Sequence, residues 1–442
     1  MSYRSGQTPD DQLRDDVRAA MEGGLDGFAI NAFSGAQAKN LLESFIRAAD
    51  SVGADNFKLI LSADMSLGFK PDEIVDTIVR YGGNPHYLKV GGKPLLSSYG
   101  GDGSMEWWSE NVLRVLETMS HPVTFVPYFD RPHPNWDTPS SSNWQDVINR
   151  SGGVDGLFNF LIPGSTPFYS QDPNIGHHWW SILEAEESLS KALHDRGKFF
   201  IAPYMPYYWA VCHPARQYVE EQGGRGMTNW WTSIINVQRP EMVELITWND
   251  YSESTYVQPT RVPLSKTPGV TSYSHIGYYE LLKYYIAWYR SGHAPSISND
   301  ALFYFYRPQQ RRPDLDATDS SCKLGRVKES QLWGKVENAI YVTTALTHSA
   351  ELVARNAFGL RSFQVPDGIA TTTIPINGFP LVLELWANDK LIQKAKIMGL
   401  SDDNKSDNFN VESGYLVSTG ASSDSWNPSD AWKTGRVSVW FR

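Results

Sequence analysis

Two carboxylates stand close together in the stretch "MVELITWNDYSESTYVQP". After an apolar run typical of a buried strand, the stretch places Asp250 and Glu253 within four residues, beside Trp248, Asn249 and Tyr251. Two acids at one cavity can hydrolyse an acetal, because one donates a proton to the departing oxygen while the other activates a water or attacks directly. We therefore take the pair as candidate catalytic residues. A turn-forming role for Asp250 after the strand is the competing interpretation.

Further candidate residues lie at the ends of other predicted strands. Asp64 ends one of them and is a third acidic candidate. Aromatic residues make up 13% of the chain, and flat rings with a polar edge suit a surface that binds sugars, although a large aromatic core explains the same count. We expect these side chains to contact the substrate: Asn31, Tyr99, Tyr128, Tyr204, Trp209, Trp248, Asn249 and Tyr251.

The composition excludes several classes of function. The net charge is −10, the pI is near 5.5, and Lys and Arg are not clustered, so we expect no nucleic-acid partner. No stretch is apolar over the ~18 residues that a membrane span needs. The cysteines, Cys212 and Cys322, lack metal-binding spacing, and the sequence has no phosphate-binding loop, GxGxxG or GxSxG motif. We expect neither a metal nor another cofactor.

Apolar runs of strand length alternate with helical stretches up to about residue 290, which predicts βα units around a parallel sheet. Helices are predicted between most of the strands, with a first helix near residue 10 and a last one just before Gly292. The carboxyl ends of the strands of a (β/α)8 barrel converge on one cavity, and such a fold gathers the candidate residues. The predicted strands span 27–33, 57–64, 93–100, 123–130, 156–163, 198–206 and 242–249.

Seven strands are one short of a (β/α)8 TIM-like barrel. The missing first strand should precede the helix near residue 10, but "MSYRSGQ" is too short and too polar for it. We expect that the chain was cut upstream, with a poor substitute strand in residues 1–7 as the alternative. The predicted catalytic domain is thus an α/β barrel over residues 1–292 that lacks its first strand.

The pattern of the sequence changes after Gly292. Short strands recur with turn residues between them, and no helical period is evident. This spacing predicts a β-sandwich-like accessory domain over residues 297–442. The predicted strands lie in "DALFYFYRP", "KVENAIYVTTALT", "SAELVARNA", "FPLVLELWAND", "KLIQKAKIMG" and "VSVWFR".

The stretch that holds the acid pair resembles the WNDYxES sequence of the fungal α-1,3-glucanases, or mutanases, of glycoside hydrolase family 71. Other segments agree with the family in order and spacing, including "GLDGFAINAF", "FKLILSADMS", "YLKVGGKPLLSSYGG", "VTFVPYFD", "FIAPYMPYYW" and "ALFYFYRPQ". The resemblance covers nearly the whole chain. It implies a (β/α)8 hydrolase of α-1,3-linked glucan that acts with inversion and without a cofactor.

The resemblance also implies roles for the acids. Asp250 and Glu253 stand at the positions of the family's acidic pair, and Asp64 stands at that of a further active-site aspartate. We expect Glu253 to be the general acid and Asp250 the base, with Asp64 as the alternative base. The carboxyl groups of an inverting pair stand ~6.5–9.5 Å apart to admit a water molecule.

This sequence departs from the family in three places. Ser252 stands where the family typically has Gly, "FVPYFD" and "FNFLIP" lack the usual Trp, and the first strand is missing. Any positive φ at Ser252 would be strained. The departures favour a second hypothesis, a glucan-binding relative without turnover, and a glycosidase acting on another polysaccharide is a third.

The resemblance implies a location as well. The family is largely secreted, so we expect a protein that acts outside the cell or in the cell wall. We also expect a monomer. The first twenty residues, however, lack the apolar stretch of a secretory signal. An intracellular enzyme is therefore the alternative.

Overall fold

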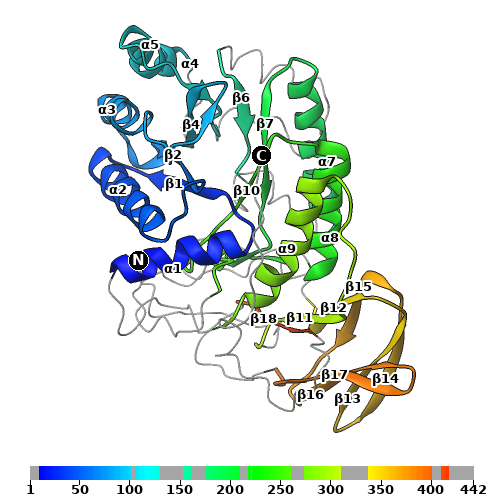
Figure 1. Cartoon of the computed structure of the whole chain (residues 1–442). Helices are drawn as coiled ribbons and strands as arrows, with labels where there is room; N and C mark the ends of the chain where they lie inside the picture. The colour runs from blue at the N-terminus through cyan, green and yellow to red at the C-terminus, as the bar shows by residue number, and fades with distance from the viewer. Residues whose placement is uncertain are drawn as a thin grey trace, which may run out of the picture.

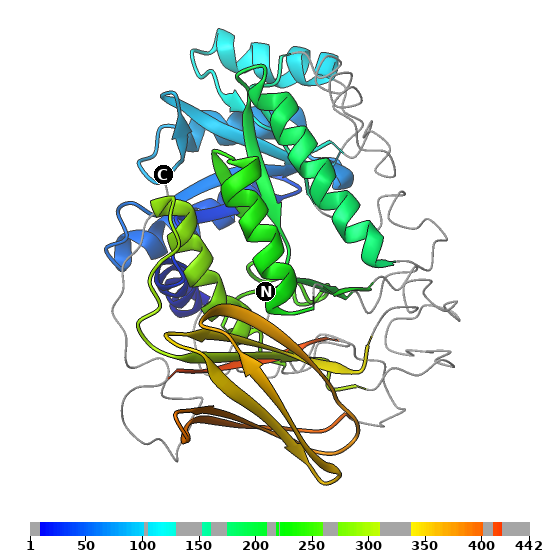
Figure 2. The same cartoon turned by 90° about the vertical axis from the view of Figure 1, so that its right-hand side faces the viewer.

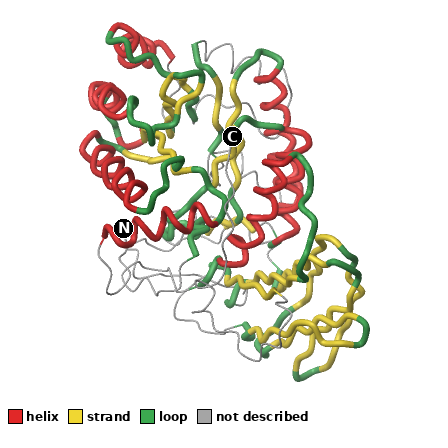
Figure 3. The backbone as a smooth tube through the Cα atoms, in the orientation of Figure 1, coloured by secondary structure: helices red, strands yellow, loops and turns green. Residues whose placement is uncertain are grey.

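The computed structural model describes most of the chain in two regions (Figures 1 and 3). A mainly parallel region, up to residue 291, has strands on the inside and helices on the outside, and an antiparallel region begins at residue 301. The cysteines and the predicted strand "VSVWFR" lie outside the described residues. The described residues are 9–100, 105–129, 153–160, 175–209, 218–220, 222–259, 273–309, 337–400 and 410–417.

All seven predicted strands of the parallel region form, although several are shorter than predicted. A two-residue strand, β3 (Lys89–Val90), pairs antiparallel with β4, and β8 (Tyr207–Trp209) pairs antiparallel with β9 (Tyr218–Glu220). The seven strands are β1 (Gly27–Ala32), β2 (Lys58–Asp64), β4 (Lys93–Tyr99), β5 (Thr124–Phe125), β6 (Gly156–Phe158), β7 (Phe199–Tyr204) and β10 (Met242–Leu245).

These seven strands are neighbours in chain order. β1, β2, β4 and β5 pair in parallel, as do β6, β7 and β10. Backbone hydrogen bonds from Phe158 N to Pro127 O at 3.0 Å, and from Asp155 N to Phe125 O at 2.9 Å, connect the two sets. Within the described chain, no strand lies between β10 and β1. All four residues of β10 are half-buried, whereas β7 is almost fully buried, because one side of β10 has no neighbouring strand.

Helices cover the outer face of the strands. α2, α3, α4 and α5 flank β1, β2 and β4, and α7, α8 and α9 flank β6, β7 and β10 (Figure 1). In α3 the apolar residues Ile74, Val75 and Ile78 recur at helical spacing, and all three are buried. None of the described helices is long and apolar enough to cross a membrane. The helices are α1 (Pro9–Glu22), α2 (Gly35–Ser51), α3 (Pro71–Tyr81), α4 (Met105–Trp108), α5 (Arg114–Thr118), α7 (Ile175–His194), α8 (Gly224–Ser233) and α9 (Ile276–Ser291).

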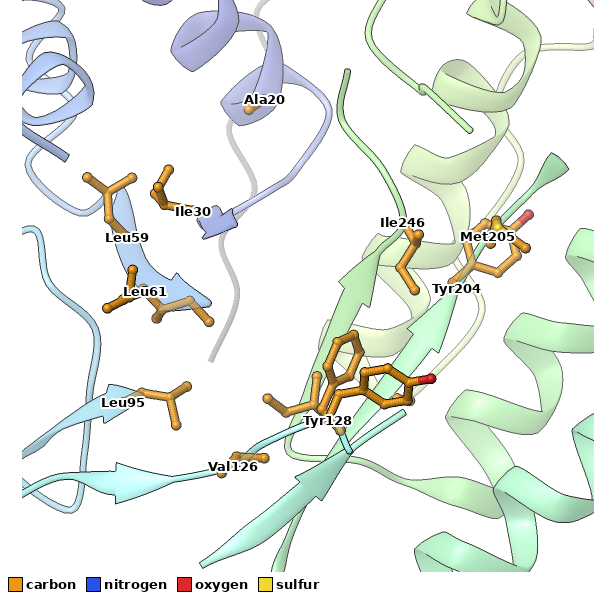
Figure 4. Close-up of a cluster of buried hydrophobic side chains, with 14 of the residues drawn as sticks. Ala20, Ile30, Leu59, Leu61, Leu95, Val126, Tyr128, Tyr204, Met205 and Ile246 are labelled. Carbon is orange, nitrogen blue, oxygen red and sulfur yellow. The ribbon is translucent and has the colours of Figure 1, made fainter. Parts of the chain in front are cut away.

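Side chains from neighbouring strands fill the space between the two sets of strands. Leu95 comes from β4, and Val126 and Tyr128 follow from the next strand (Figure 4). Each of the three is at most 1% exposed. The interior is therefore packed, and functional side chains must lie at the ends of the strands rather than inside a pore.

Contacts between α9 and the start of the chain connect the two outer strands. The Tyr279 hydroxyl donates to the carbonyl oxygen of Ala19 at 2.7 Å. Arg290 Nη2 donates to Asp26 Oδ1 at 2.8 Å and to the Gly24 carbonyl at 3.0 Å. Because α9 follows β10 and these partners precede β1, the contacts hold the two open edges in place.

The antiparallel region is a sandwich of two four-stranded sheets. Their strand orders are β15-β12-β11-β18 and β14-β13-β16-β17, and their facing sides share a core that includes Leu302, Val342, Leu352 and Leu383. The predicted sandwich-like strands therefore form where they are described, whereas β14, β15 and β18 were not predicted. The strands are β11 (Ala301–Tyr306), β12 (Ala339–Leu346), β13 (Ala350–Asn356), β14 (Gly359–Val365), β15 (Gly368–Pro375), β16 (Leu381–Ala387), β17 (Lys390–Ile397) and β18 (Glu412–Val417).

The first of these sheets lies against the parallel region (Figure 2). The ring of Phe305 on β11 is 4.6 Å from that of Tyr278 on α9. A Cβ added to Gly224, at the start of α8, would lie 2.0 Å from Thr343 Oγ1 on β12. The two regions are thus in close contact, and the second sheet lies on the far side.

The contact between Arg290 and Asp26 gives a test of how the open edges are held. We expect Arg290→Met to lower the free energy of unfolding by roughly 2–4 kcal/mol, because it leaves the partly buried Asp26 carboxylate without its cation. Urea unfolding measures the change. Arg18→Met is the matched control, since Arg18 pairs with Asp15 on an exposed helix face and such pairs contribute about 0–1 kcal/mol. Equal losses in the two variants would contradict the proposed importance of this contact.

Candidate active site

The acid pair lies on a loop that folds back on itself directly after β10. Thr247 N donates to the Thr255 carbonyl at 3.1 Å, and Val257 N donates to the Thr247 carbonyl at 3.0 Å. Gln258 N donates to the Trp248 carbonyl at 3.0 Å. We call residues 247–258 the acid loop. Its backbone bonds fix where the two carboxylates stand relative to the end of the strand.

Asp250 forms the turn of the acid loop. Its Oδ1 accepts hydrogen bonds from Ser252 Oγ at 2.6 Å and from Glu253 N at 3.1 Å. Its own N–H donates to Thr247 Oγ1 at 2.8 Å. The turn-forming interpretation of Asp250 is therefore correct as far as Oδ1 is concerned. Among the described residues Oδ2 accepts no hydrogen bond, and it is available to a water molecule.

Glu253 is half-buried beside Asp250. The Tyr208 hydroxyl approaches Glu253 Oε1 at 3.5 Å, and the Glu253 carbonyl accepts from Trp209 N at 2.9 Å. Burial, followed by the negative charge of Asp250, raises the pKa of Glu253 to about 7, and the Tyr208 hydrogen bond opposes the rise. A carboxyl group with this pKa retains a proton near neutral pH, as a general acid must.

Ser252 adopts no strained conformation in place of the family's glycine. The positive φ of the loop falls on Ser254, at 57°, and not on Ser252. The Ser252 hydroxyl instead adds a hydrogen bond to Asp250. The strain that the sequence suggested at this position is therefore absent, and the substitution adds a contact within the acid pair's turn.

Asp64 lies at the end of β2 with both carboxylate oxygens engaged. Oδ1 accepts from Ser66 N at 3.0 Å and from Ser66 Oγ at 2.6 Å, which caps a short 3-10 turn, Met65–Leu67. Oδ2 accepts from Asn31 Nδ2 at 3.3 Å. The structure thus joins two of the predicted site residues, Asp64 and Asn31. It leaves Asp64 less free than Asp250 to take a proton from water.

Five of the predicted substrate contacts are accessible to varying degrees. Asn31 and Asn249 are exposed, and Tyr99, Trp248 and Tyr251 are half-buried. The Trp248 ring lies 5.3 Å from the ring of Phe28 on β1, so the acid loop reaches across to the other outer strand. These five side chains remain candidates for binding a substrate.

Tyr204, at the end of β7, packs inside the structure. It is fully buried, and its ring lies 5.5 Å from that of Trp231 on α8. Side chains alternate between the two faces of a strand, and Tyr204 falls on the face that packs against the helices. It therefore does not face the space above the strand ends.

Tyr128 and Trp209 are also buried, at 1% and 3% exposure. The Tyr128 ring packs 5.6 Å from Tyr99 and 6.1 Å from Phe160. In this structure both residues support accessible neighbours instead of presenting a surface of their own. Their role as direct sugar contacts stays a prediction.

Two side chains were not predicted from the sequence: Tyr208, which contacts Glu253, and Glu244, in the strand before the acid loop. Tyr208 lies in the segment "FIAPYMPYYW". Its approach to Glu253 depends on the fold and cannot be read from the local sequence. Glu244 lies within β10, opposite Pro203, and burial raises the pKa of its carboxyl group to about 8. The sequence does single out Glu244, because it is an acidic residue inside the apolar run "MVELIT".

The described residues contain no cluster of three or more His, Cys, Asp or Glu side chains that could hold a metal ion. The side chains of the acid loop include carboxyl groups, hydroxyl groups and aromatic rings. Asp250 and Glu253 interact directly, because Asp250 Oδ1 accepts from Glu253 N and the charge of Asp250 raises the pKa of Glu253.

Curated relatives match most of the chain. A glucan endo-1,3-alpha-glucosidase of Schizosaccharomyces pombe is 26% identical over 374 residues, which are 82% of this chain and 80% of the relative. A mutanase of Penicillium rubens is 26% identical over 393 residues, which are 84% of this chain and 78% of the relative. Among solved structures, the chain is similar to a GH99 endo-alpha-mannosidase from Bacteroides thetaiotaomicron, with a TM-score of 0.49 and 15% identity over 66% of this chain and 82% of that one.

A sequence model of one family covers more of the chain than any of these alignments. The family described as glycosyl hydrolase family 71 matches residues 1–425, which include the whole parallel region, the acid loop and all the described strands of the antiparallel region. Since the match spans nearly the full length, the chain belongs to glycosyl hydrolase family 71.

Proposed function

We propose that the protein hydrolyses α-1,3-glucan with inversion at the anomeric carbon, with Glu253 as general acid and Asp250 as general base. The observation that carries the proposal is the buried Glu253 carboxyl group, which the adjacent charge of Asp250 helps to keep protonated near neutral pH. Asp250 itself is half-buried and keeps one carboxylate oxygen available. The names of the relatives, a glucan endo-1,3-alpha-glucosidase and a mutanase, support the choice of substrate.

The reaction needs one proton donated to the departing oxygen and one proton removed from the attacking water. Glu253 donates its proton to the glycosidic oxygen as the bond from that oxygen to the anomeric carbon breaks. Asp250 Oδ2 takes a proton from a water molecule whose oxygen bonds to the anomeric carbon from the opposite face. Asp250 ends protonated and Glu253 ionised, and exchange with solvent restores both groups.

Asp64 and Asn31 are assigned to the sugar rather than to the water. The hydrogen bonds that Asp64 accepts from Ser66 and Asn31 occupy both its oxygens, which disfavours it as the base. Asn31 is exposed beside it and can bond a hydroxyl group of the substrate. We assign the same kind of role to the half-buried rings of Tyr99, Trp248 and Tyr251, and to Asn249.

We further propose that the seven parallel strands are part of a (β/α)8 barrel. Their continuous parallel order and their outer layer of helices support this proposal. So does the position of the acid loop and of Asp64, which follow the carboxyl ends of β10 and β2, where such barrels carry their sites. The natural substrate in this proposal is a polysaccharide of the fungal cell wall.

Removal of either acid should abolish hydrolysis. We expect Glu253→Gln and Asp250→Asn each to lower the release of reducing ends from insoluble α-1,3-glucan by about a hundredfold or more, because each removes one proton transfer. Glu106→Gln, on an exposed part of α4, is the matched control and should retain full activity. Full activity in either acid variant would refute the site. Capture of glucan by the unaltered protein without release of reducing ends would favour a binding protein.

The stereochemistry of the product tests the mechanism separately. Inversion at an α-linked anomeric carbon yields a product that is initially in the β form. Proton NMR of the first product from a soluble α-1,3-linked oligosaccharide distinguishes it from the α form before mutarotation. An initial α product would mean a retaining reaction, and the assignment of Asp250 as base to a water molecule would then be wrong.

The pH dependence follows from the state of Glu253. The acid must be protonated, so kcat/KM should fall as the pH rises through about 7, the pKa that burial and Asp250 give this group. Tyr208→Phe removes a hydrogen bond that lowers this pKa and should move the alkaline limb to higher pH, by about half a unit or less. Tyr284→Phe, on α9, is the control. A limb that moves to lower pH in Tyr208→Phe would contradict the assignment.

A further inference from the structure

A buried cluster of side chains lies directly behind the acid loop. The ring of Tyr256, in the loop, stacks on the ring of His275 with centroids 3.9 Å apart and planes within 7° of parallel. His275 Nδ1 lies 2.6 Å from the Tyr256 carbonyl oxygen. Tyr256 and His275 are at most 1% exposed, so the back of the loop is packed against the start of α9.

The antiparallel region contributes one side chain to this cluster. Asn410, two residues before β18, is fully buried, and its Nδ2 donates to the Tyr256 hydroxyl at 2.9 Å. Its Oδ1 accepts from Val411 N at 2.8 Å and lies 2.8 Å from His275 Nε2. Asn410 therefore contacts both rings of the stacked pair, from a segment that is more than 130 residues further along the chain.

The cluster is connected to the acids by a short stretch of hydrogen-bonded backbone between Glu253 and Tyr256. Tyr256 is three residues from Glu253. Between them, Thr255 N donates to the Asp250 carbonyl at 3.2 Å, and Thr255 also accepts from Thr247 N at 3.1 Å. A displacement of Tyr256 must therefore move the turn that places Asp250 and Glu253.

Other hydrogen bonds also join the two regions of the protein. Ser413 N donates to the Ser274 carbonyl at 2.7 Å, and Ser274 N donates to Glu412 Oε2 at 2.8 Å. Ser413 Oγ also accepts from Gly277 N at 3.0 Å. The start of α9 is thus attached to the segment at β18 by bonds other than those of Asn410, whose amide group contacts His275 and, in the acid loop, Tyr256.

We propose that Asn410 is a positioning residue for the acid pair, through which the antiparallel region holds Tyr256 and His275, and with them Asp250 and Glu253, in the geometry that the reaction needs. The inference rests on the proposed function and deepens it, because it assigns the accessory region a part in catalysis. Misplacement of catalytic groups by about 1 Å can lower a rate a hundredfold. Loss of the side chains that support the back of the loop can therefore lower the rate of hydrolysis.

The test compares variants of the full chain on a soluble α-1,3-linked oligosaccharide. We expect Asn410→Ala to lower kcat by roughly tenfold or more while KM changes by less than about twofold, and to shift the alkaline limb of the pH profile because the surroundings of Glu253 change. Tyr256→Phe keeps the stacked ring but loses the hydroxyl group, and it should show the same pattern more weakly. The double variant should be no worse than Asn410→Ala, because both changes remove the same contact.

Arg225→Ala is the matched control. Arg225 Nη2 donates to Thr373 Oγ1 at 2.9 Å and so connects the same two regions, away from the acid loop. We expect it to leave kcat and the pH profile unchanged. Hydrogen exchange of the amides of residues 247–258 should be faster in Asn410→Ala and Tyr256→Phe, and unchanged in Arg225→Ala.

The outcomes separate this inference from the proposed function. An unaltered protein that does not cleave the oligosaccharide overturns the proposed function, whereas hydrogen exchange still tests the support of the loop. An active protein whose Asn410→Ala and Tyr256→Phe variants keep the kcat and the alkaline limb of the unaltered protein overturns the inference. A lower melting temperature in these variants without either kinetic change also overturns it, because Asn410 would then be purely structural.

Discussion

The burial of the Glu253 carboxyl group is the constraint on which the rest of the site depends. An ionised carboxylate in this position would lose its hydration and face the charge of Asp250, so the protonated form is favoured up to a pKa of about 7. The site therefore needs one acid that stays protonated beside another that is ionised. A tight loop achieves this, because Asp250 forms its turn and Glu253 follows on the side of Tyr208 and Trp209.

The support of this loop comes from both regions of the protein. Tyr256 packs on His275 at the start of α9, and Asn410 reaches both rings from the antiparallel region. Burial lowers the pKa of His275 to about 4, so the ring is neutral at the pH at which Glu253 titrates. Its nitrogens both face oxygen atoms, and the neutral ring donates through one of them. The charge of the His275 ring therefore stays constant while Glu253 changes its protonation state.

The sequence predicted the elements of the parallel region better than the directions of individual side chains. Apolar runs and helical periods were sufficient to place all seven strands, because both signals are local. Tyr204 was predicted to bind the substrate because it ends a strand, but whether a strand residue faces the helices or the interior depends on register, and a shift of one residue reverses it. β14 and β15 were missed because most of their residues are exposed or half-buried and carry no continuous apolar signal.

The acid pair itself was predicted from its spacing and its resemblance to a family, whereas its surroundings were not. Tyr208 and Asn410 act on the loop from 45 and 154 residues away, measured from Glu253 and Tyr256, and no local pattern indicates such partners. The turn-forming interpretation of Asp250 is confirmed, and the catalytic interpretation stays a proposal. Oδ1 satisfies the turn by accepting from Glu253 N, and this bond draws the next acid towards it. The turn that a structural aspartate makes is therefore what brings its charge close enough to raise the pKa of Glu253.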